Sequence, residues 1–215
     1  NQVVHLNKSV KIFFACPNIP NPGVYLKLLP DDKYENTEVD IFGFSPVNQH
    51  KCILDSQIKK IKIFNDLTQR FNSIFIEDSM ELLELLNKVG RDSSNIVFCD
   101  SRSAVLDYAI KYYSMCSEIE KCDDLQTLLE DIKKEIHPKC YLIPLLKRGI
   151  CYHVGYLPAT IKEKIEVLYR KKVIKTIFCT STLLEGVNLP ADNLFIAIKK
   201  NSYILGKSAT FKNLI

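Results

Sequence analysis

The segment that decides the fold reads Val173-Ile174-Lys175-Thr176-Ile177-Phe178-Cys179, and it runs directly into Thr180-Ser181-Thr182-Leu183-Leu184-Glu185-Gly186-Val187-Asn188-Leu189-Pro190. The first part is apolar and predicts a buried strand, while the second predicts a turn rich in hydroxyl groups with one glycine. In open sheets of parallel strands, ligands bind outside the carboxyl ends of the strands. Backbone N–H groups and small hydroxyls at such an end can hold an anion, and phosphate is the obvious candidate.

Around this strand, the chain from about residue 78 alternates between short apolar strands and amphipathic helices. Strands are predicted at residues 96–99, 150–154, 173–179 and 194–198. A capping box of Asp78 with Glu81 predicts the start of one helix, and Gly90 predicts its end. Ser101 predicts the start of a second helix, and an apolar face over residues 125–136, ended by Pro138, predicts a third. A second capping box, Thr160 with Glu163, predicts the start of a fourth. This alternation predicts an α/β fold with a mostly parallel sheet that is covered by helices on both faces.

The first 75 residues have a different character. One apolar strand is predicted at residues 10–15, and the four prolines after it exclude a long helix there. Two further strands are predicted at residues 52–55 and 61–64. The change of character near residue 45 predicts two parts, with residues 1–45 holding the tail of a neighbouring domain and a linker, and residues 46–215 forming the main α/β domain.

Length and composition bound the class of protein. With 215 residues, of which 47% are hydrophobic, the chain can bury a full core. The net charge of +4 gives no overall electrostatic argument for nucleic-acid binding, and the local run Arg170-Lys171-Lys172 has a simpler interpretation as a solvated helix end. No apolar run approaches 18 residues, which predicts no membrane contact. The start Asn1-Gln2-Val3, without Met or a signal sequence, predicts a fragment of a longer protein.

The cysteines and histidines predict neither a metal site nor disulfides. Eight cysteines are present, but no two form a Cys-x-x-Cys pair, and the four histidines show no spacing suited to zinc. Several cysteines lie in apolar strand-like runs, where a thiol behaves as a small hydrophobe: Cys16, Cys99, Cys151 and Cys179. Reduced thiols indicate a cytoplasmic protein.

Residues 180–190 resemble motif V of superfamily 2 helicases of the DEAD/DEAH-box-related group, in the variant Thr-Ser-Thr-Leu-x-Glu-Gly-Val-Asn-Leu-Pro. The resemblance covers roughly residues 94–215, because residues 96–102 resemble motif IV and residues 149–158 resemble the His-x-Gly-x-Leu-Pro segment, in family order. Residues 14–22 lie where the first RecA-like domain of that family ends with motif III. The hydroxyls of its Ser-Ala-Thr are missing here, since the chain has Cys16-Pro17-Asn18 before Ile19-Pro20-Asn21-Pro22.

The resemblance implies that residues 46–215 form the second RecA-like domain of a helicase, truncated before motif VI. It implies that Thr180, Ser181 and Thr182 contact the phosphates of a bound strand. It further implies nucleic-acid contacts for Ser101, Arg102 and Gly155, nucleotide contacts for Glu185, Gly186 and Asn188, and a structural role for His153. Simpler interpretations exist for some of them, because Thr180–Thr182 and Ser101 suit helix starts after core strands and Arg102 suits an exposed surface.

The sequence contains neither a Gly-x-x-x-x-Gly-Lys-Ser/Thr loop to hold ATP phosphates nor an Asp-Glu-x-His run to hold Mg²⁺. We therefore expect no catalytic residue, no bound cofactor and no ATP hydrolysis in this fragment alone. In the longer protein the resemblance implies ATP and Mg²⁺, a strand of RNA or DNA and the first RecA-like domain as partners. Two alternatives remain: a helicase-like module that has lost catalysis and serves as a binding scaffold, and an unrelated α/β enzyme with a phosphate-binding turn.

Overall fold

The computed structural model describes residue 23 and residues 50–55, 58–65, 67–75, 80–180 and 189–197. Contacts divide the chain into two units, residues 1–51 and residues 52–215, and all elements below belong to the second. The predicted strand at residues 10–15 lies outside the described residues. So does the predicted domain boundary near residue 45, which stays a prediction.

A sheet of four parallel strands confirms the predicted α/β fold. The strands are β4 (Asn95–Cys99), β5 (Ile150–His153), β6 (Thr176–Cys179) and β7 (Asn193–Ala197). Their spatial order is β5-β6-β4-β7, and every neighbouring pair is parallel. β4, β5 and β6 are buried at every residue, as expected for strands covered on both faces.

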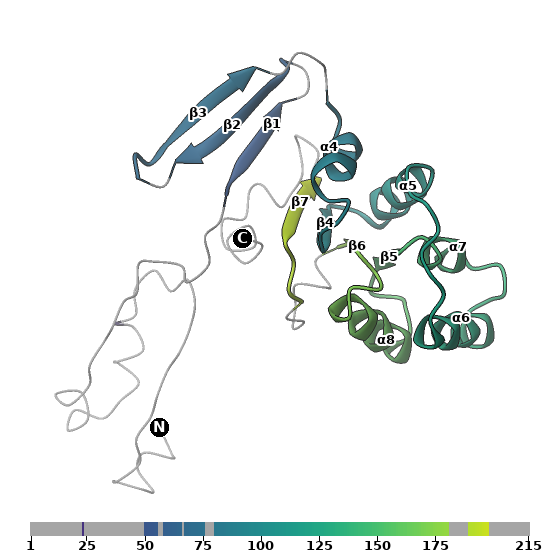
Figure 1. Ribbon diagram of the computed structural model, residues 1–215. Coiled ribbons are helices and arrows are strands. Elements are labelled where there is room, and N and C mark those ends of the chain that lie inside the picture. Colours follow the sequence, from purple (N-terminus) through teal and green to yellow (C-terminus); the bar gives the residue numbers. More distant parts are fainter. Residues whose placement is uncertain are drawn as a thin grey trace, which may run out of the picture. The chain divides into compact units, whose positions relative to one another are not determined.

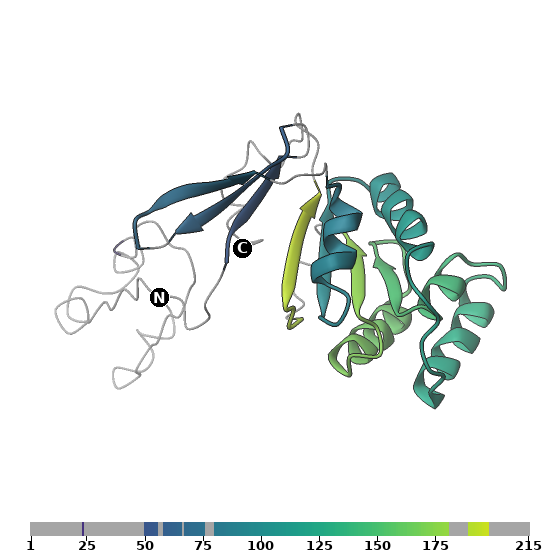
Figure 2. The same cartoon turned by 45° about the horizontal axis from the view of Figure 1, so that its top comes forward.

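In the part of the chain that the structure describes, five helices accompany this sheet: α4 (Leu82–Val89), α5 (Arg102–Tyr113), α6 (Asp123–Glu135), α7 (Leu142–Leu146) and α8 (Ala159–Arg170). Figures 1 and 2 show α4 and α5 on one face of the sheet and α8 on the other. The ring of Tyr112 on α5 meets Phe178 on β6 edge-on, with 5.9 Å between the ring centroids. On α8, Ile161 and Ile165 are fully buried in the same core. Among the described helices none is long and apolar enough to cross a membrane.

Helices α6 and α8 run antiparallel and are joined by three polar contacts along their length. The hydroxyl of Thr160 donates to Oε2 of Glu135 at 2.8 Å, Lys164 pairs with Asp131, and Lys171 pairs with Asp124. The predicted capping box of Thr160 and Glu163 is therefore wrong. The hydroxyl of Thr160 is used by a neighbouring helix, and Pro158 is the residue that precedes the first turn.

The start of α4 also differs from the prediction. The helix begins after Glu81, whose backbone N–H donates to the carboxylate of Glu84 at 2.9 Å, so the capping box lies three residues later than predicted. Its end is as predicted, because the N–H of Gly90 donates to the carbonyl of Leu86. A side chain at Gly90 would lie 2.5 Å from Oδ1 of Asn95, so this close approach requires glycine.

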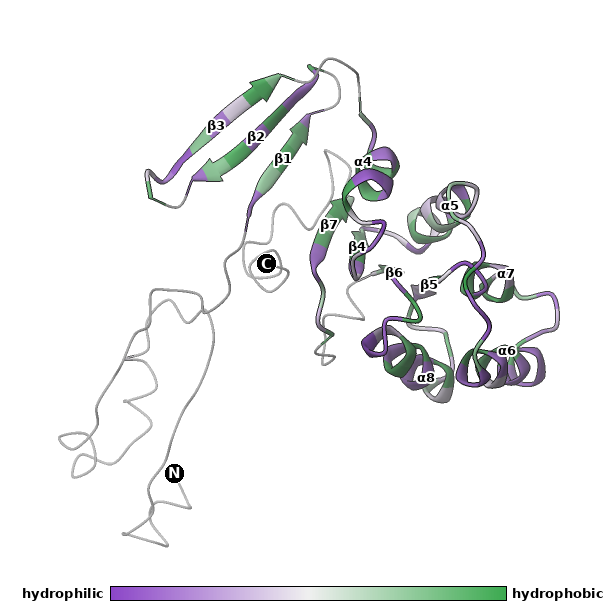
Figure 3. Ribbon diagram, in the orientation of Figure 1, coloured by the Kyte–Doolittle hydropathy of each residue, from purple (hydrophilic) through white to green (hydrophobic). Residues whose placement is uncertain are grey.

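A second, antiparallel sheet precedes α4 and contains β1 (Cys52–Asp55), β2 (Lys60–Asn65) and β3 (Arg70–Phe75). The first two strands are those predicted. The turn between β2 and β3 is closed by Oδ1 of Asn65, which accepts from the N–H groups of Leu67 and Thr68. Figure 3 shows both hydrophobic and hydrophilic residues on these strands, and successive side chains of each strand point to opposite faces of the sheet.

Candidate functional site

The predicted binding segments converge at one edge of the parallel sheet. We call it the carboxyl edge and define it as residues 99–102, 153–156 and 179–180. β6 lies between β5 and β4, and Cys179 is paired with His153 on one side and with Phe98 on the other. Neighbouring strands lie about 4.8 Å apart. Thr180 therefore leaves the sheet between the segments that carry Gly155 and Ser101.

Ser101 stands at the start of α5 and caps it. Its Oγ accepts the N–H of Ala104 at 3.2 Å and lies 3.2 Å from Oγ of Ser103. The predicted helix start is confirmed, and this bond by itself accounts for a serine at the position. A hydroxyl that also has a serine beside it still has acceptor and donor capacity for a further ligand.

Arg102 is the first residue of α5 and is exposed. The first turn of this helix contains no acidic residue, so the positive end of the helix dipole and the guanidinium act in the same direction. An anion near this point is attracted by both charges, while the carboxylate of Asp100, which directly precedes Ser101, opposes it. Arg102 is the group of this part of the carboxyl edge that suits a phosphate.

Gly155 and Tyr156 project from a tight turn at the end of β5. The N–H of Leu157 donates to the carbonyl of Val154 at 3.2 Å, and these two residues are buried while the two between them are exposed. Tyr156 is 55% exposed. Sequence reasoning did not single it out, although an aromatic residue next to a glycine at a strand end was a signal for a surface contact.

His153, at the end of β5, is buried and faces α8. Its Nε2 lies 3.4 Å from Oε1 of Glu166, and within the described residues neither ring nitrogen makes a hydrogen bond of good geometry. Burial lowers the pKa of His153, and the nearby carboxylate of Glu166 opposes this shift only in part. A neutral, enclosed imidazole fits a positioning role, in which it connects the end of β5 to α8.

Three cysteines lie in the sheet close to this edge, and none is a nucleophile. Burial raises the pKa of Cys99 to about 12, with a smaller contribution from Asp100, and burial likewise raises the pKa of Cys151 and Cys179. The thiolate is the reactive form of cysteine, so these thiols act as small apolar side chains. Among the described residues no group of three His, Cys, Asp or Glu side chains is placed to hold a metal ion.

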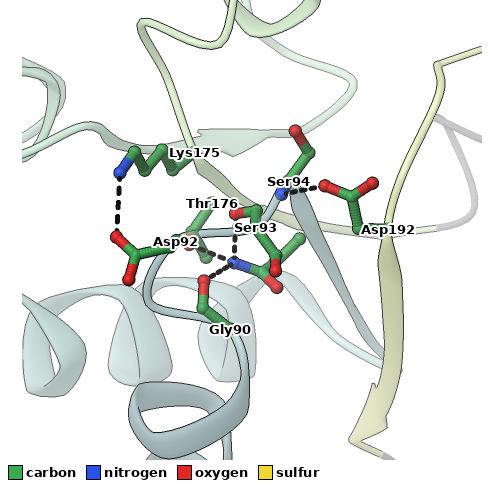
Figure 4. A network of polar contacts seen from close by, with 8 residues as sticks. Gly90, Asp92, Ser93, Ser94, Lys175, Thr176 and Asp192 are labelled. Atoms are coloured by element: carbon green, nitrogen blue, oxygen red, sulfur yellow. Dashed lines mark hydrogen bonds and ion pairs between the residues drawn. The ribbon is translucent and has the colours of Figure 1, made fainter.

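The opposite end of the sheet holds a polar network, which we call the amino edge and define as residues 90–95, 175–176 and 192–193. Nδ2 of the fully buried Asn95 donates to the carbonyls of Gly90 at 2.7 Å and Ser93 at 2.9 Å, and Oδ1 accepts from Asn193 at 3.0 Å. Figure 4 shows this network with Thr176 beside it, the contact from Ser94 to Asp192 and the ion pair of Lys175 with Asp92. Its polar groups are bonded to one another, which indicates a structural role.

The remaining predicted site residues lie outside the described residues: Ser181, Thr182, Glu185, Gly186 and Asn188. Their roles stay predictions. The description resumes at Leu189, which packs against the core of the parallel sheet.

No family model matches the chain, but several curated proteins are similar to it. Helicase POLQ-like from Homo sapiens is 25% identical over 225 aligned residues, which cover 94% of this chain and 20% of that protein. ATP-dependent DNA helicase Hel308 from Methanococcus vannielii is 27% identical over 159 residues, covering 70% of this chain and 21% of that protein. Exosome RNA helicase MTR4 from Homo sapiens is 43% identical over 63 residues, covering 29% of this chain and 6% of that protein. The chain thus spans about a fifth or less of the length of these relatives.

Proposed function

Because the chain is a relative of the superfamily 2 helicases and contains a helicase-related α/β domain, we propose that it belongs to an ATP-dependent helicase. In this proposal it comprises the second RecA-like domain and the tail of the first RecA-like domain. In this proposal Thr180, Ser181 and Thr182 contact the phosphates of a bound strand. Ser101, Arg102 and Gly155 contribute the neighbouring contacts.

One observation supports this proposal above all. Thr180 leaves β6 between the ends of β4 and β5, so segments that lie about 80 and 25 residues before it in the chain meet at one edge. Beside the carboxylate of Asp100, the polar groups there include hydroxyls, a guanidinium and backbone N–H groups. Such groups bind phosphate oxygens without reading the bases, which a protein that moves along a strand requires.

The proposal does not distinguish between RNA and DNA as the bound strand. The similar proteins include both an RNA helicase and a DNA helicase by name, and contacts to phosphates suit both polymers. The proposal therefore covers a strand of RNA or of DNA.

The proposal also includes an ATP site, which is separate from the site that binds the strand. Glu185, Gly186 and Asn188 are proposed to face the nucleotide, while a phosphate-binding loop and the Mg²⁺ ligands come from a first RecA-like domain. ATP bound between two such domains supplies the energy of phosphoryl transfer, which depends on positioning and on stabilising the charge of the transferred group. The free cysteines of the described residues support a reducing, cytoplasmic location as part of the same proposal.

The test is an ATPase assay of the full-length protein, alone and with RNA, single-stranded DNA or duplex DNA. We expect ATP hydrolysis that increases at least severalfold with one of these polymers, and no turnover by the 215-residue chain assayed in parallel. Hydrolysis by the purified 215-residue chain would contradict the assignment of the phosphate loop to another domain. Full-length protein that binds a strand without hydrolysing ATP would support the second candidate.

That second candidate is a helicase-like module that has lost catalysis and serves as a binding scaffold. Its support is the sequence Cys16-Pro17-Asn18, which lacks the hydroxyls of motif III. Restoring Ser, Ala and Thr at Cys16, Pro17 and Asn18 in the full-length protein separates the two candidates. A gain of strand-stimulated hydrolysis favours the scaffold, and an unchanged high rate favours the motor.

A further inference from the structure

The antiparallel sheet has two faces of different chemistry. From the pairing of the strands, one face carries four aliphatic residues, Leu54, Ile61, Ile63 and Ile74, together with Cys52, Asn65, Arg70 and Asn72. The other carries lysines, phenylalanines and three further residues, and we call it the aromatic face: Ile53, Asp55, Lys60, Lys62, Phe64, Phe71, Ser73 and Phe75. Because this alternation follows from the two-residue period of a strand, it holds along the whole sheet.

This face contains two groups of side chains in contact, Lys60 with Phe75 and Phe64 with Phe71, and Lys62 lies between the two groups. Nζ of Lys60 lies 5.1 Å from the ring centroid of Phe75, its partner across the strands. Four residues further along β2, Phe64 packs on Phe71 with 5.0 Å between the ring centroids. The two groups are therefore roughly 13 Å apart, and Lys62 stands between them opposite Ser73.

This face is accessible and positively charged. Phe75 is 75% exposed and Phe71 is 46% exposed, and every residue of β3 is exposed. Lys60 and Lys62 on this face are basic, and Asp55, the cross-strand partner of Lys60, is acidic, so the face itself has a net charge of +1. Residues 50–75 as a whole contain five basic and two acidic residues, and this excess of positive charge attracts a polyanion.

A single nucleic-acid strand matches this chemistry better than a protein does. Lysine is depleted in the buried parts of protein interfaces, because its ammonium group loses water there without a partner. A single strand offers flat bases that stack on exposed aromatic rings and phosphates that pair with lysines. A duplex keeps its bases stacked inside and offers only phosphates. We propose that the aromatic face binds a single strand, with bases stacked on Phe71 and Phe75 and phosphates beside Lys60 and Lys62.

This inference adds a second binding surface to the chain and does not depend on ATP hydrolysis or on the carboxyl edge. It is tested on the 215-residue chain by fluorescence anisotropy with a labelled 20-nucleotide oligo(U), a labelled oligo(dT) and a blunt 20-base-pair duplex. The test variant is Phe71→Ala with Phe75→Ala. The matched control is Ile74→Ala, which removes an equally exposed apolar side chain from the other face of the same strand.

We expect the double variant to weaken binding of both single strands at least tenfold, and Ile74→Ala to change it less than twofold. Duplex binding should be weaker than single-strand binding and insensitive to the double variant. Replacing Lys60 and Lys62 with Gln should reduce the slope of log K against log salt by about 1.4, since each phosphate contact contributes about 0.7 on a single strand. The control for charge is Lys88→Gln with Lys111→Gln, two lysines on α4 and α5.

Circular dichroism shows whether each variant is folded, and cross-linking gives a measurement that needs no variant. Oligonucleotides with 5-iodouracil, irradiated on the wild-type chain, should form cross-links that map to the peptides of β2 and β3. Equal affinities for the double variant and Ile74→Ala, with no cross-link on these strands, would overturn the proposal. A change in oligomeric state in the double variant, without a change in strand affinity, would assign the face to a second copy of the chain. Loss of strand binding in Thr180→Ala alone would assign binding to the carboxyl edge only.

Discussion

The two edges of the parallel sheet carry similar polar residues but use them differently. At the amino edge, Asn95 is fully buried and all its polar atoms are bonded within the protein. At the carboxyl edge, Arg102 and Gly155 are exposed. Arg102 is the first residue of α5, and Gly155 lies in the turn that follows β5. A polar group that is buried and satisfied contributes to folding, and one that faces solvent at a strand end is accessible to a ligand.

This comparison predicts that the edges respond differently to substitution. Changes at the amino edge lower the free energy of unfolding and leave the strand affinity of the folded protein unaltered. Changes at the exposed residues of the carboxyl edge, such as Arg102, lower the strand affinity and leave the free energy of unfolding unaltered, whereas the buried His153 contributes to stability. A variant of Arg102 that loses stability as strongly as an amino-edge variant would remove the distinction.

The largest expected effect is that of Asn95→Ala. The substitution leaves the carbonyl of Gly90 and the amide of Asn193 without their buried partners, and we expect the free energy of unfolding to fall by about 3 kcal/mol. Urea denaturation followed by circular dichroism measures it. The control is Asn72→Ala, an exposed asparagine on β3, for which we expect a change within about 0.5 kcal/mol. Equal effects of the two variants would show that the network contributes nothing.

The next effect concerns pH and His153. Burial holds the pKa of His153 in the folded protein below its ordinary value of 6.5. At a pH between the pKa of the folded protein and 6.5, the unfolded chain therefore binds more protons than the folded one. Stability should therefore fall as the pH is lowered below about 6.5, by up to about 1.4 kcal/mol per pH unit from this residue.

Denaturation of the wild type and of His153→Leu between pH 5 and 8 isolates this contribution. The variant should have a smaller slope of stability against pH. In Glu166→Gln, loss of the carboxylate lowers the pKa of His153 further, so the slope should extend to lower pH. Identical slopes in the wild type and His153→Leu would mean that the imidazole is not protonated on unfolding.

The smallest expected effect belongs to the carboxyl edge. Thr180→Ala in the full-length protein should weaken single-strand affinity by about 1 kcal/mol, the contribution of one neutral hydrogen bond, and equally for all base sequences. Thr127→Ala on α6 is the matched control, because that hydroxyl donates to the carbonyl of Asp123 within its own helix. A loss confined to one base sequence would indicate base reading and contradict contacts to phosphates.

The sequence predicted the parallel strands well because burial on both faces makes them apolar along their whole length. It misplaced their ends, since Val173 and Ile174 are apolar but only Thr176–Cys179 form the strand. It missed β3, whose sequence Arg-Phe-Asn-Ser-Ile-Phe mixes polar and apolar residues because no residue of that strand is buried. It also missed α7, where Pro144 argues against a helix but is tolerated in the first turn.

The start of α5 was predictable because its capping bond is local, whereas the equally local capping box of α4 lies three residues after the predicted one. Ser101 bonds to Ala104, three residues away, and the prediction was right. Thr160 instead bonds to Glu135, 25 residues away, and no local pattern reveals such a contact. Ile136, predicted on the apolar face of α6, follows the last turn and is exposed.

The candidate site was predictable in part for the same reason. The rule that ligands bind at the carboxyl ends of parallel strands pointed to Thr180 from a single segment. The strand order was not predictable, and it is the order β5-β6-β4 that brings Gly155 and Ser101 to either side of Thr180. The network around Asn95 also escaped prediction, because Asn193 lies 98 residues away along the chain.

The most direct test of the central claim, that the carboxyl edge is the functional edge of this sheet, is an NMR titration of the ¹⁵N-labelled chain with a short oligo(U) and oligo(dT). Amide signals of residues 100–102, 154–156 and 180–182 are predicted to shift together and to saturate with one affinity, while those of residues 92–95 and 192–193 stay in place. Shifts at the amino edge with an unchanged carboxyl edge, or no shift at either edge at millimolar oligonucleotide, would contradict the account.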